Sequence, residues 1–164
     1  MDIYFVKGEV EKILTSCTDR IRSKNLITEI SYEYTNDRCD ECSIDDKNLD
    51  NLYANLTVKR TPDDEVGYEL GFYIDCKRGV VDGAEFDNAI MELRAEAEEL
   101  AEAITGAEDV DACLGEMIEK QRQATEEAKA ELDAMLKDLR RKTLIGIAAG
   151  IALIVLIALA VAIF

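Results

Sequence analysis

Cys39 and Cys42 form the most compact chemical motif of the chain, a C-x-x-C pair within a polar stretch. Two thiolates at this spacing can bind a zinc ion or form a redox-active disulfide. Zinc usually takes four protein ligands, and Cys76, with a carboxylate such as that of Asp37 or Asp75, would complete such a set. Three interpretations stay open: a structural zinc site, a redox pair and ordinary surface thiols.

The rest of the composition removes most enzyme classes. The chain has five cysteines and no histidine, so the commonest general base and the commonest metal ligand are both absent. No glycine-rich phosphate loop or complete EF-hand pattern occurs. An odd number of cysteines behind an N-terminus without a signal-peptide layout favours reduced cytosolic thiols. We therefore expect no enzymatic activity and, zinc excepted, no cofactor.

The charge balance limits the choice of partners. Lys and Arg number 19 against 35 Asp and Glu, which gives a net charge of -16. This charge repels phosphate backbones and argues against nucleic acid as the main ligand. The same negative charge keeps a small cytosolic domain soluble. Because nucleic acid is disfavoured, we expect the partner to be a protein.

The C-terminal run 143–164 is uncharged and contains no proline. As a helix it would be about 33 Å long, close to the roughly 30 Å hydrocarbon core of a bilayer. The basic residues Arg140, Arg141 and Lys142 precede it directly, and the positive-inside rule keeps that side cytoplasmic. The sequence therefore predicts a tail-anchored, single-pass protein with its N-terminal domain in the cytoplasm and the basic triplet at anionic lipid headgroups.

Gly146 and Gly150 form a G-x-x-x-G pair inside this run. Small residues on one face of a membrane helix let two backbones approach closely. One interpretation is a homodimer through the transmembrane helix. The other is that glycine and alanine are simply common in membrane helices.

Apolar residues at steps of three and four predict two amphipathic helices in the remainder of the chain. The first covers residues 3–22, with a short strand over 2–6 as the alternative. The second covers 86–105 and begins after Asp82 and Glu85, which form a capping-box pattern. These helices would supply one layer of a small domain.

Between the helices the apolar period changes to two, which predicts three half-buried strands over 26–34, 52–59 and 66–76. The Pro-Asp turn at 61–64 is short enough to join the second and third strands as a hairpin, and the polar loop 36–50 joins the first two. The simplest result is an antiparallel meander. In a meander the end of the first strand and the end of the third lie at the same end of the sheet, which would bring Cys76 toward the C-x-x-C pair.

The sequence thus predicts an α+β fold: an α-β-β-β-α head with a three-stranded antiparallel sheet, a long helical stalk and one C-terminal transmembrane helix. The expected divisions are an α-β-β-β region over residues 1–82, an acidic helical segment over 83–142 that packs partly on the head, and the membrane helix over 143–164. Gly106 and Gly115 are the expected kinks of the helical segment. Its apolar stripe is thin between residues 121 and 127, so a coiled coil is only weakly indicated there.

Two resemblances concern the order of elements alone. The order helix, three strands, helix resembles the first half of the acidic secretion-chaperone fold, which would imply dimerisation and partner binding. A predicted anchor stands where that fold has its later strands. A head, a helical segment and a C-terminal span also resemble a SNARE-type fusion protein, although the glycines and broken heptads depart from it.

The functional expectation is a non-enzymatic, membrane-tethered protein that binds a cytosolic protein or serves as a scaffold. The alternative is a thiol-dependent redox or zinc sensor that uses Cys39 and Cys42.

Overall fold

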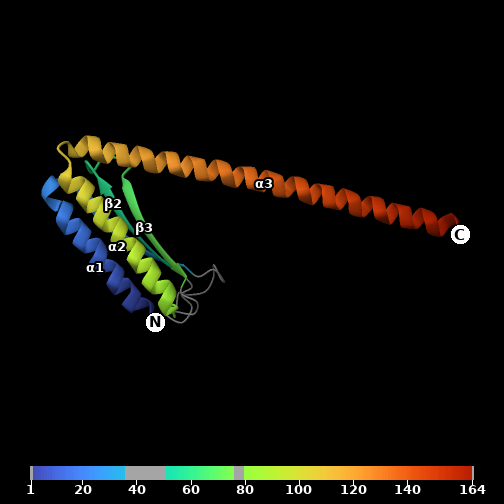
Figure 1. Ribbon diagram of the computed structural model, residues 1–164, viewed down its shortest axis with the longest axis horizontal. Helices are drawn as coiled ribbons and strands as arrows, with labels where there is room; N and C mark the ends of the chain where they lie inside the picture. The colour runs from blue at the N-terminus through green and yellow to red at the C-terminus, as the bar shows by residue number, and fades with distance from the viewer. Residues whose placement is uncertain (1, 36–50, 76–79, 164) are drawn as a thin grey trace. The chain divides into compact units, whose positions relative to one another are not determined.

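The computed structural model describes residues 2–35, 51–75 and 80–163, and the side chains as far as residue 140. The elements follow the order α1 (Ile3–Ile21), a short 3-10 helix η1 (Arg22–Lys24), β1 (Ile27–Thr35), β2 (Asn51–Lys59), β3 (Tyr68–Asp75), α2 (Gly83–Gly106) and α3 (Val110–Ile163) (Figure 1). The chain is α+β with a three-stranded antiparallel sheet, as the change of apolar period predicts.

The first helix begins where a side chain can satisfy its free backbone donors. The carboxylate of Asp2 accepts a hydrogen bond from the backbone N–H of Tyr4 at 2.7 Å. The helix ends through η1 at Asn25, whose φ of 58° is in the left-handed region that asparagine tolerates better than most residues. The expected helix over 3–22 is confirmed, and Asp2 contributes only an isolated bridge to Val80 rather than a strand.

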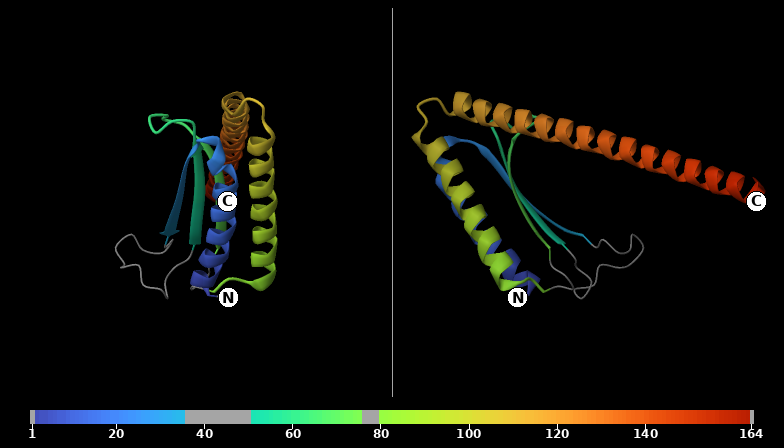
Figure 2. Two further views of the ribbon diagram at one scale, coloured as in Figure 1. Left: turned by 90° about the vertical axis from the view of Figure 1, so that its left-hand side faces the viewer. Right: turned by 45° about the vertical axis from the view of Figure 1, so that its right-hand side comes forward.

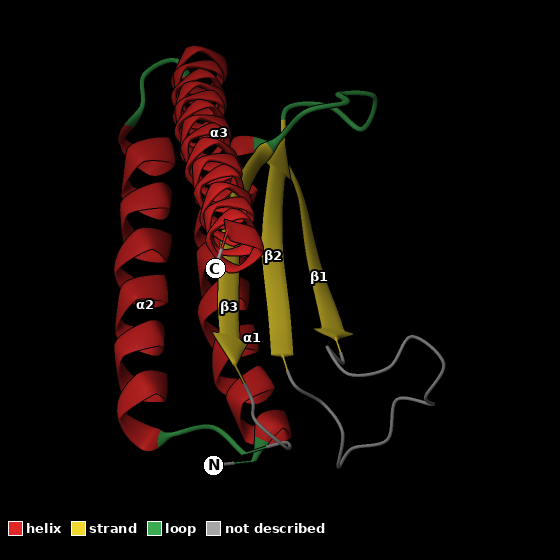
Figure 3. Ribbon diagram, turned by 90° about the vertical axis from the view of Figure 1, so that its right-hand side faces the viewer, coloured by secondary structure: helices red, strands yellow, loops and turns green. Residues whose placement is uncertain are grey.

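The strands form a meander in the order β1-β2-β3, with both pairings antiparallel. Figure 3 shows the three strands side by side in this order. Tyr32, Ala54 and Phe72 lie in one cross-strand row, and Ser31, Asn55 and Gly71 lie in the next. The third strand begins two residues later than predicted, at Tyr68, and Val66 before it is exposed.

The hairpin between β2 and β3 is held at the predicted Pro-Asp turn. The Asp64 carboxylate accepts hydrogen bonds from the backbone N–H groups of Arg60 and Thr61, at 3.2 and 3.1 Å. These bonds, above all the one from Thr61, lower the pKa of Asp64. Gly67 follows, and a Cβ there would lie 2.8 Å from the carbonyl oxygen of Val58, so the close approach of the two strands requires glycine.

Helices α1 and α2 lie side by side along one face of the sheet (Figure 2). Their apolar stripes and the helix-facing side chains of the sheet make one core. The buried core residues of α1 are Ile3, Val6, Val10, Leu14, Cys17 and Ile21, and the larger ones of α2 are Phe86, Leu93, Leu100 and Ile104. Each layer covers the apolar side of the other, which is what stabilises a small two-layer domain.

Helices α2 and α3 each begin at an aspartate. Asp82 accepts hydrogen bonds from the backbone N–H groups of Ala84 and Glu85, at 2.9 and 3.3 Å, as the capping pattern predicts. Asp109 accepts one from the backbone N–H of Ala112 at 3.0 Å. Such caps satisfy donors that the helix itself leaves free.

The chain divides into two compact units, residues 1–119 and 120–164. Gly106 is the last residue of α2, whereas α3 remains helical through Gly115. The first turns of α3 belong to the first unit, where Leu114 is fully buried in the core. This packing favours a continuous helix there and outweighs the roughly 1 kcal/mol by which glycine is worse than alanine in a helix.

Candidate functional site

The sheet has one covered and one open face. Because side chains alternate along a strand, the residues that do not face the helices share the opposite face. Asn51 shares this face at a strand end and is buried. Nine residues of the face lie away from the strand ends: Glu29, Ser31 and Glu33 on β1, Tyr53, Asn55 and Thr57 on β2, and Glu69, Gly71 and Tyr73 on β3. Seven of these nine are exposed, and Asn55 and Thr57 are half-buried. This surface is called the open face below.

The open face carries an ordered aromatic pair in the cross-strand row that follows the row of Asn51 on this face. The ring centroids of Tyr53 and Tyr73 lie 4.8 Å apart, with a tilt of 42° between the rings, which is a favourable geometry for aromatic contact. Tyr73 is nevertheless 52% exposed. Exposed tyrosines held in place by their neighbours are typical of protein-binding surfaces, since they offer contact area at a small loss of side-chain entropy.

A row of side-chain hydrogen bonds at the end of the sheet, which connects two neighbouring cross-strand pairings, fixes this pair. The hydroxyl of Tyr73 donates to the side-chain oxygen of Asn51 at 3.0 Å, and the amide nitrogen of Asn51 donates to the hydroxyl of Thr35 at 3.2 Å. Asn51 is almost fully buried, so these bonds satisfy an amide that would otherwise be costly to bury. The row links all three strands and orients the Tyr73 ring.

The helices cover the edge strand β1 less completely than they cover β2 and β3. Its helix-facing residues Thr28, Ile30, Tyr32 and Tyr34 are half-buried, whereas the residues paired with them on β2 are fully buried. The ammonium group of Lys7 on α1 lies 4.8 Å from the Tyr32 ring centroid, within the range of a cation–π contact. Burial, with smaller effects from Glu11 and Tyr34, raises the pKa of Tyr32, so its phenol stays protonated at neutral pH.

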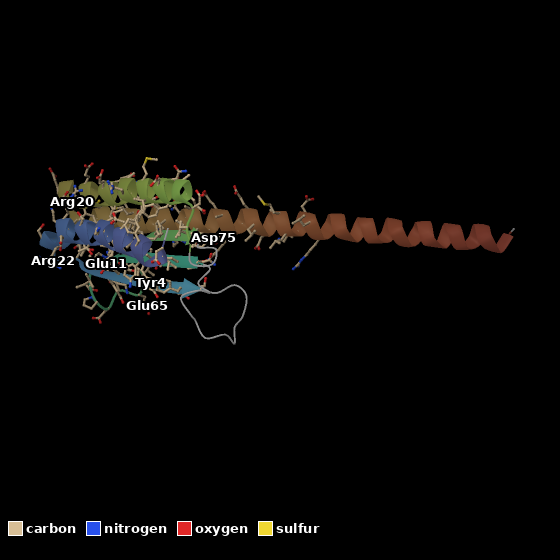
Figure 4. The ribbon with its side chains drawn as sticks, turned by 90° about the horizontal axis from the view of Figure 1, so that it is seen from below. Tyr4, Glu11, Arg20, Arg22, Glu65 and Asp75 are labelled. Atoms are coloured by element: carbon tan, nitrogen blue, oxygen red, sulfur yellow. The ribbon has the colours of Figure 1, made fainter. Side chains whose placement is uncertain are left out.

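A groove of about 330 Å³ separates α1 from α2 on the outer side of the helix layer. Lys12, Arg20 and Arg94 line it together with Glu98, and Figure 4 labels Arg20 on α1. Cys17 lies at its base, where burial raises the pKa of the thiol more than the neighbouring Arg20 lowers it. A thiol in this state is a poor nucleophile. The lining also contains Glu9, so two carboxylates partly offset the three cations of the groove.

The predicted cysteine site lies outside the described residues, because Cys39, Cys42 and Cys76 all fall in 36–50 and 76–79. The described neighbours of these segments do share one end of the sheet, since Thr35 and Asp75 both pair with Asn51. Over the residues that the structure describes, no group of three or more Cys, Asp or Glu side chains is arranged to hold a metal ion.

The predicted membrane-proximal residues are only partly described. Arg140 is exposed near the end of the described side chains, and the side chains of Arg141 and Lys142 lie outside them. The backbone at Gly146 and Gly150 is helical, as a segment of α3. Among the described residues, no helix has both the length and the apolar character needed to cross a bilayer. The uncharged run 143–164 lies beyond the last residue whose side chain is described.

Sequence reasoning found the strands but missed the incomplete cover of β1. The alternation of Thr28, Ile30, Tyr32 and Tyr34 predicts one buried face and does not reveal how far a helix extends over it. Tyr32 and Tyr34 gave no signal of it either, because tyrosine suits covered and partly covered faces alike, and the hydroxyl oxygens of both are buried.

Known proteins provide no further guide to the site. Comparison of the chain with models of protein families, with curated proteins and with solved structures gave no match.

Proposed function

We propose that this protein is a non-enzymatic, membrane-anchored binding module, whose α+β head presents its sheet to a cytosolic protein. The observation that carries the proposal is that the helices cover one face of the sheet and leave most of the other exposed, including the Tyr53–Tyr73 pair. Aromatic residues surrounded by polar ones are the composition of a moderate-affinity protein interface.

The anchor is supported by sequence and charge. The run 143–164 is uncharged and directly follows Arg140, Arg141 and Lys142. Helix α3 is continuous from Val110 to Ile163, so a single helix would connect the head to the bilayer. The basic triplet favours a cytoplasmic position of the head.

The absence of histidine from the chain supports a role without catalysis, because it removes the usual general base. The buried thiol of Cys17 does not replace it, since burial raises the pKa of that thiol.

The anchor is tested by two pairs of leucine-to-arginine changes on the same helix. Leu153→Arg with Leu156→Arg places two charges within 143–164, at about 3 kcal/mol each for insertion into a bilayer. Leu132→Arg with Leu136→Arg makes the same change where the side chains are exposed. We expect only the first pair to move the full chain from the alkali-resistant membrane fraction to the soluble fraction. Equal behaviour of both pairs would refute the anchor.

The binding role is tested by site-specific photocrosslinking in cells. A benzophenone side chain in place of Tyr73 probes the open face, and one in place of Met91 probes an exposed position on α2. We expect a discrete crosslinked protein from Tyr73 and none from Met91. Crosslinks of equal pattern from the two positions, or from neither, would contradict the assignment of the sheet as the binding surface.

A further inference from the structure

The outer edge of β1 is one of the two edges of the three-stranded sheet. Within the described ranges β1 pairs only with β2, so the backbone groups along its other side have no strand partner. The strand extends over Ile27–Thr35, which is long for an edge. Unpaired edges of this length accept an added strand unless the protein protects them.

The two edges of the sheet would gain differently from an added strand. At β3 the helix-facing residues Leu70, Phe72 and Ile74 are already buried, so a neighbour there would remove little further apolar surface from water. At β1 the corresponding residues Ile30 and Tyr32 are only half-buried. A strand beside β1 would complete their burial, and apolar burial is the main driving force of association.

A polar group also lacks a partner at this edge. The hydroxyl oxygen of Tyr32 is buried and makes no hydrogen bond with any residue that the structure describes. Lys7 lies over the ring and Glu11 is close enough to affect the pKa of the phenol. An incoming residue beside Tyr32 could supply the missing acceptor, which would remove the cost of an unsatisfied buried group.

The charged residues of β1 determine which kind of strand can pair with its outer edge. On the open-face side of the edge β1 carries Glu29 and Glu33, both exposed and separated by Ser31. If β1 paired with a second copy of itself over its full length, antiparallel register about Ser31 would place Glu29 of each copy opposite Glu33 of the other. Like charges directly opposite each other destabilise a sheet. The same carboxylates would favour lysine or arginine at alternate positions of a different strand.

We propose that the β1 edge binds an extended segment of a partner protein as a fourth strand, in which apolar residues alternate with basic ones. Its apolar side chains pack beside Ile30 and Tyr32, and its basic side chains lie opposite Glu29 and Glu33. The net charge of -16 attracts such a segment to the head from a distance. This inference rests on the proposed binding function and names the partner class and the docking position.

The test uses the full chain in detergent micelles and three synthetic octapeptides. One alternates valine and lysine, one alternates valine and glutamate, and one has the first peptide's composition with its valines and lysines in separate blocks. Binding is followed by NMR chemical shifts of backbone amides and by their hydrogen exchange. We expect saturable binding of the alternating lysine peptide alone, with the largest shifts over Ile27–Thr35 and new protection of β1 amides from exchange.

Matched charge variants locate the site. Glu29→Lys with Glu33→Lys should weaken binding of the alternating lysine peptide by at least about fivefold, because two favourable cross-strand pairs become repulsive. Glu69→Lys with Glu92→Lys makes the same change of net charge on β3 and α2, and should weaken binding by less than about twofold. An amide spectrum that is unchanged away from the substituted residues shows that each variant is folded.

Four outcomes would overturn the proposal. They are equal binding of the block peptide, equal losses in the two variants, outward β1 amides that are already protected without peptide, and the absence of binding by any of the peptides at millimolar concentration. Already protected amides in a chain that sediments as a dimer would identify a second copy as the occupant. If crosslinking at Tyr73 still captures a partner while the peptides fail, the binding function stands and only the β1 assignment falls.

Discussion

Helix α2 and the distal segment of α3, residues 120–140, both place apolar residues three or four positions apart. In α2 the stripe is buried: Leu93, Leu100 and Ile104 lie in the core. In the distal segment of α3, Leu132 is 56% exposed and Leu139 is 59% exposed. The spacing therefore marks an amphipathic helix in both places, but burial depends on a second apolar surface, which only α2 finds in the sheet and α1.

The largest expected difference is between removing a buried leucine side chain and removing an exposed one. Leu114→Ala deletes a fully buried side chain and should lower the free energy of unfolding by about 3 kcal/mol, from lost burial and the remaining cavity. Leu132→Ala should change it by less than about 0.5 kcal/mol. Urea unfolding of the head, followed by circular dichroism, measures both. A large loss at Leu132 would show that a surface covers this segment of α3 in solution.

Two glycines give a second contrast. Gly67→Ala forces a Cβ to 2.8 Å from the Val58 carbonyl oxygen, and overpacking of this kind should cost about 2 kcal/mol. Gly115→Ala meets no atom within 4 Å and should stabilise α3 by up to about 1 kcal/mol, because alanine is the better helix former. Thermal unfolding distinguishes the two signs. A destabilised Gly115→Ala would indicate a bend at this residue that alanine does not permit.

A smaller effect separates the capped start of α2 from the middle of α3. Asp82→Ala removes the side chain that accepts from Ala84 and Glu85 and should cost about 1 kcal/mol. Asp133→Ala, at an exposed position inside α3, should be neutral or slightly stabilising. Asp82→Asn is the conservative control, since asparagine caps helices about as well as aspartate. Equal losses for the alanine and asparagine variants would show that charge, rather than capping, matters at this position.

The smallest expected effect concerns pH at the β2–β3 turn. The pKa of Asp64 is lowered in the folded chain, first by the hydrogen bond from the Thr61 backbone. A carboxylate with a lowered pKa stabilises the fold above its unfolded pKa, and this stabilisation is lost as the pH falls through the folded pKa. We therefore expect the protection factors of the Arg60 and Thr61 amides, which are corrected for the intrinsic exchange rate, to fall as the Asp64 carboxylate is protonated at acidic pH. The effect should be absent in Asp64→Asn, whereas persistence of the pH dependence in that variant would assign it to another group.

Much of the head follows from the sequence. The period-two runs give all three strands and their alternation, because a strand with one buried face must alternate. Asp82 marks the start of α2 for an equally local reason. The ends of the elements follow less directly from the sequence: Val66 suits a strand by type, but β3 starts at Tyr68, after Gly67.

The binding surface could not be predicted in the same way. The register that places Tyr53 beside Tyr73, and the extent to which α1 covers β1, arise from contacts between residues distant in the chain. The apolar periodicity of a strand or helix shows which of its sides is apolar. It does not show how much of that side a neighbouring element covers. The half-buried state of Ile30 and Tyr32 is such a case.

The hydrogen-bonded row of Thr35, Asn51 and Tyr73 also has an engineering consequence. It fixes the end of β1 and the start of β2 through their own side chains, so the pairing of these strands does not depend on the length of the chain that joins them. A small tag or reporter domain inserted between Thr35 and Asn51 should therefore leave the strand register unchanged, at a closure entropy that grows only with the logarithm of the insert's length.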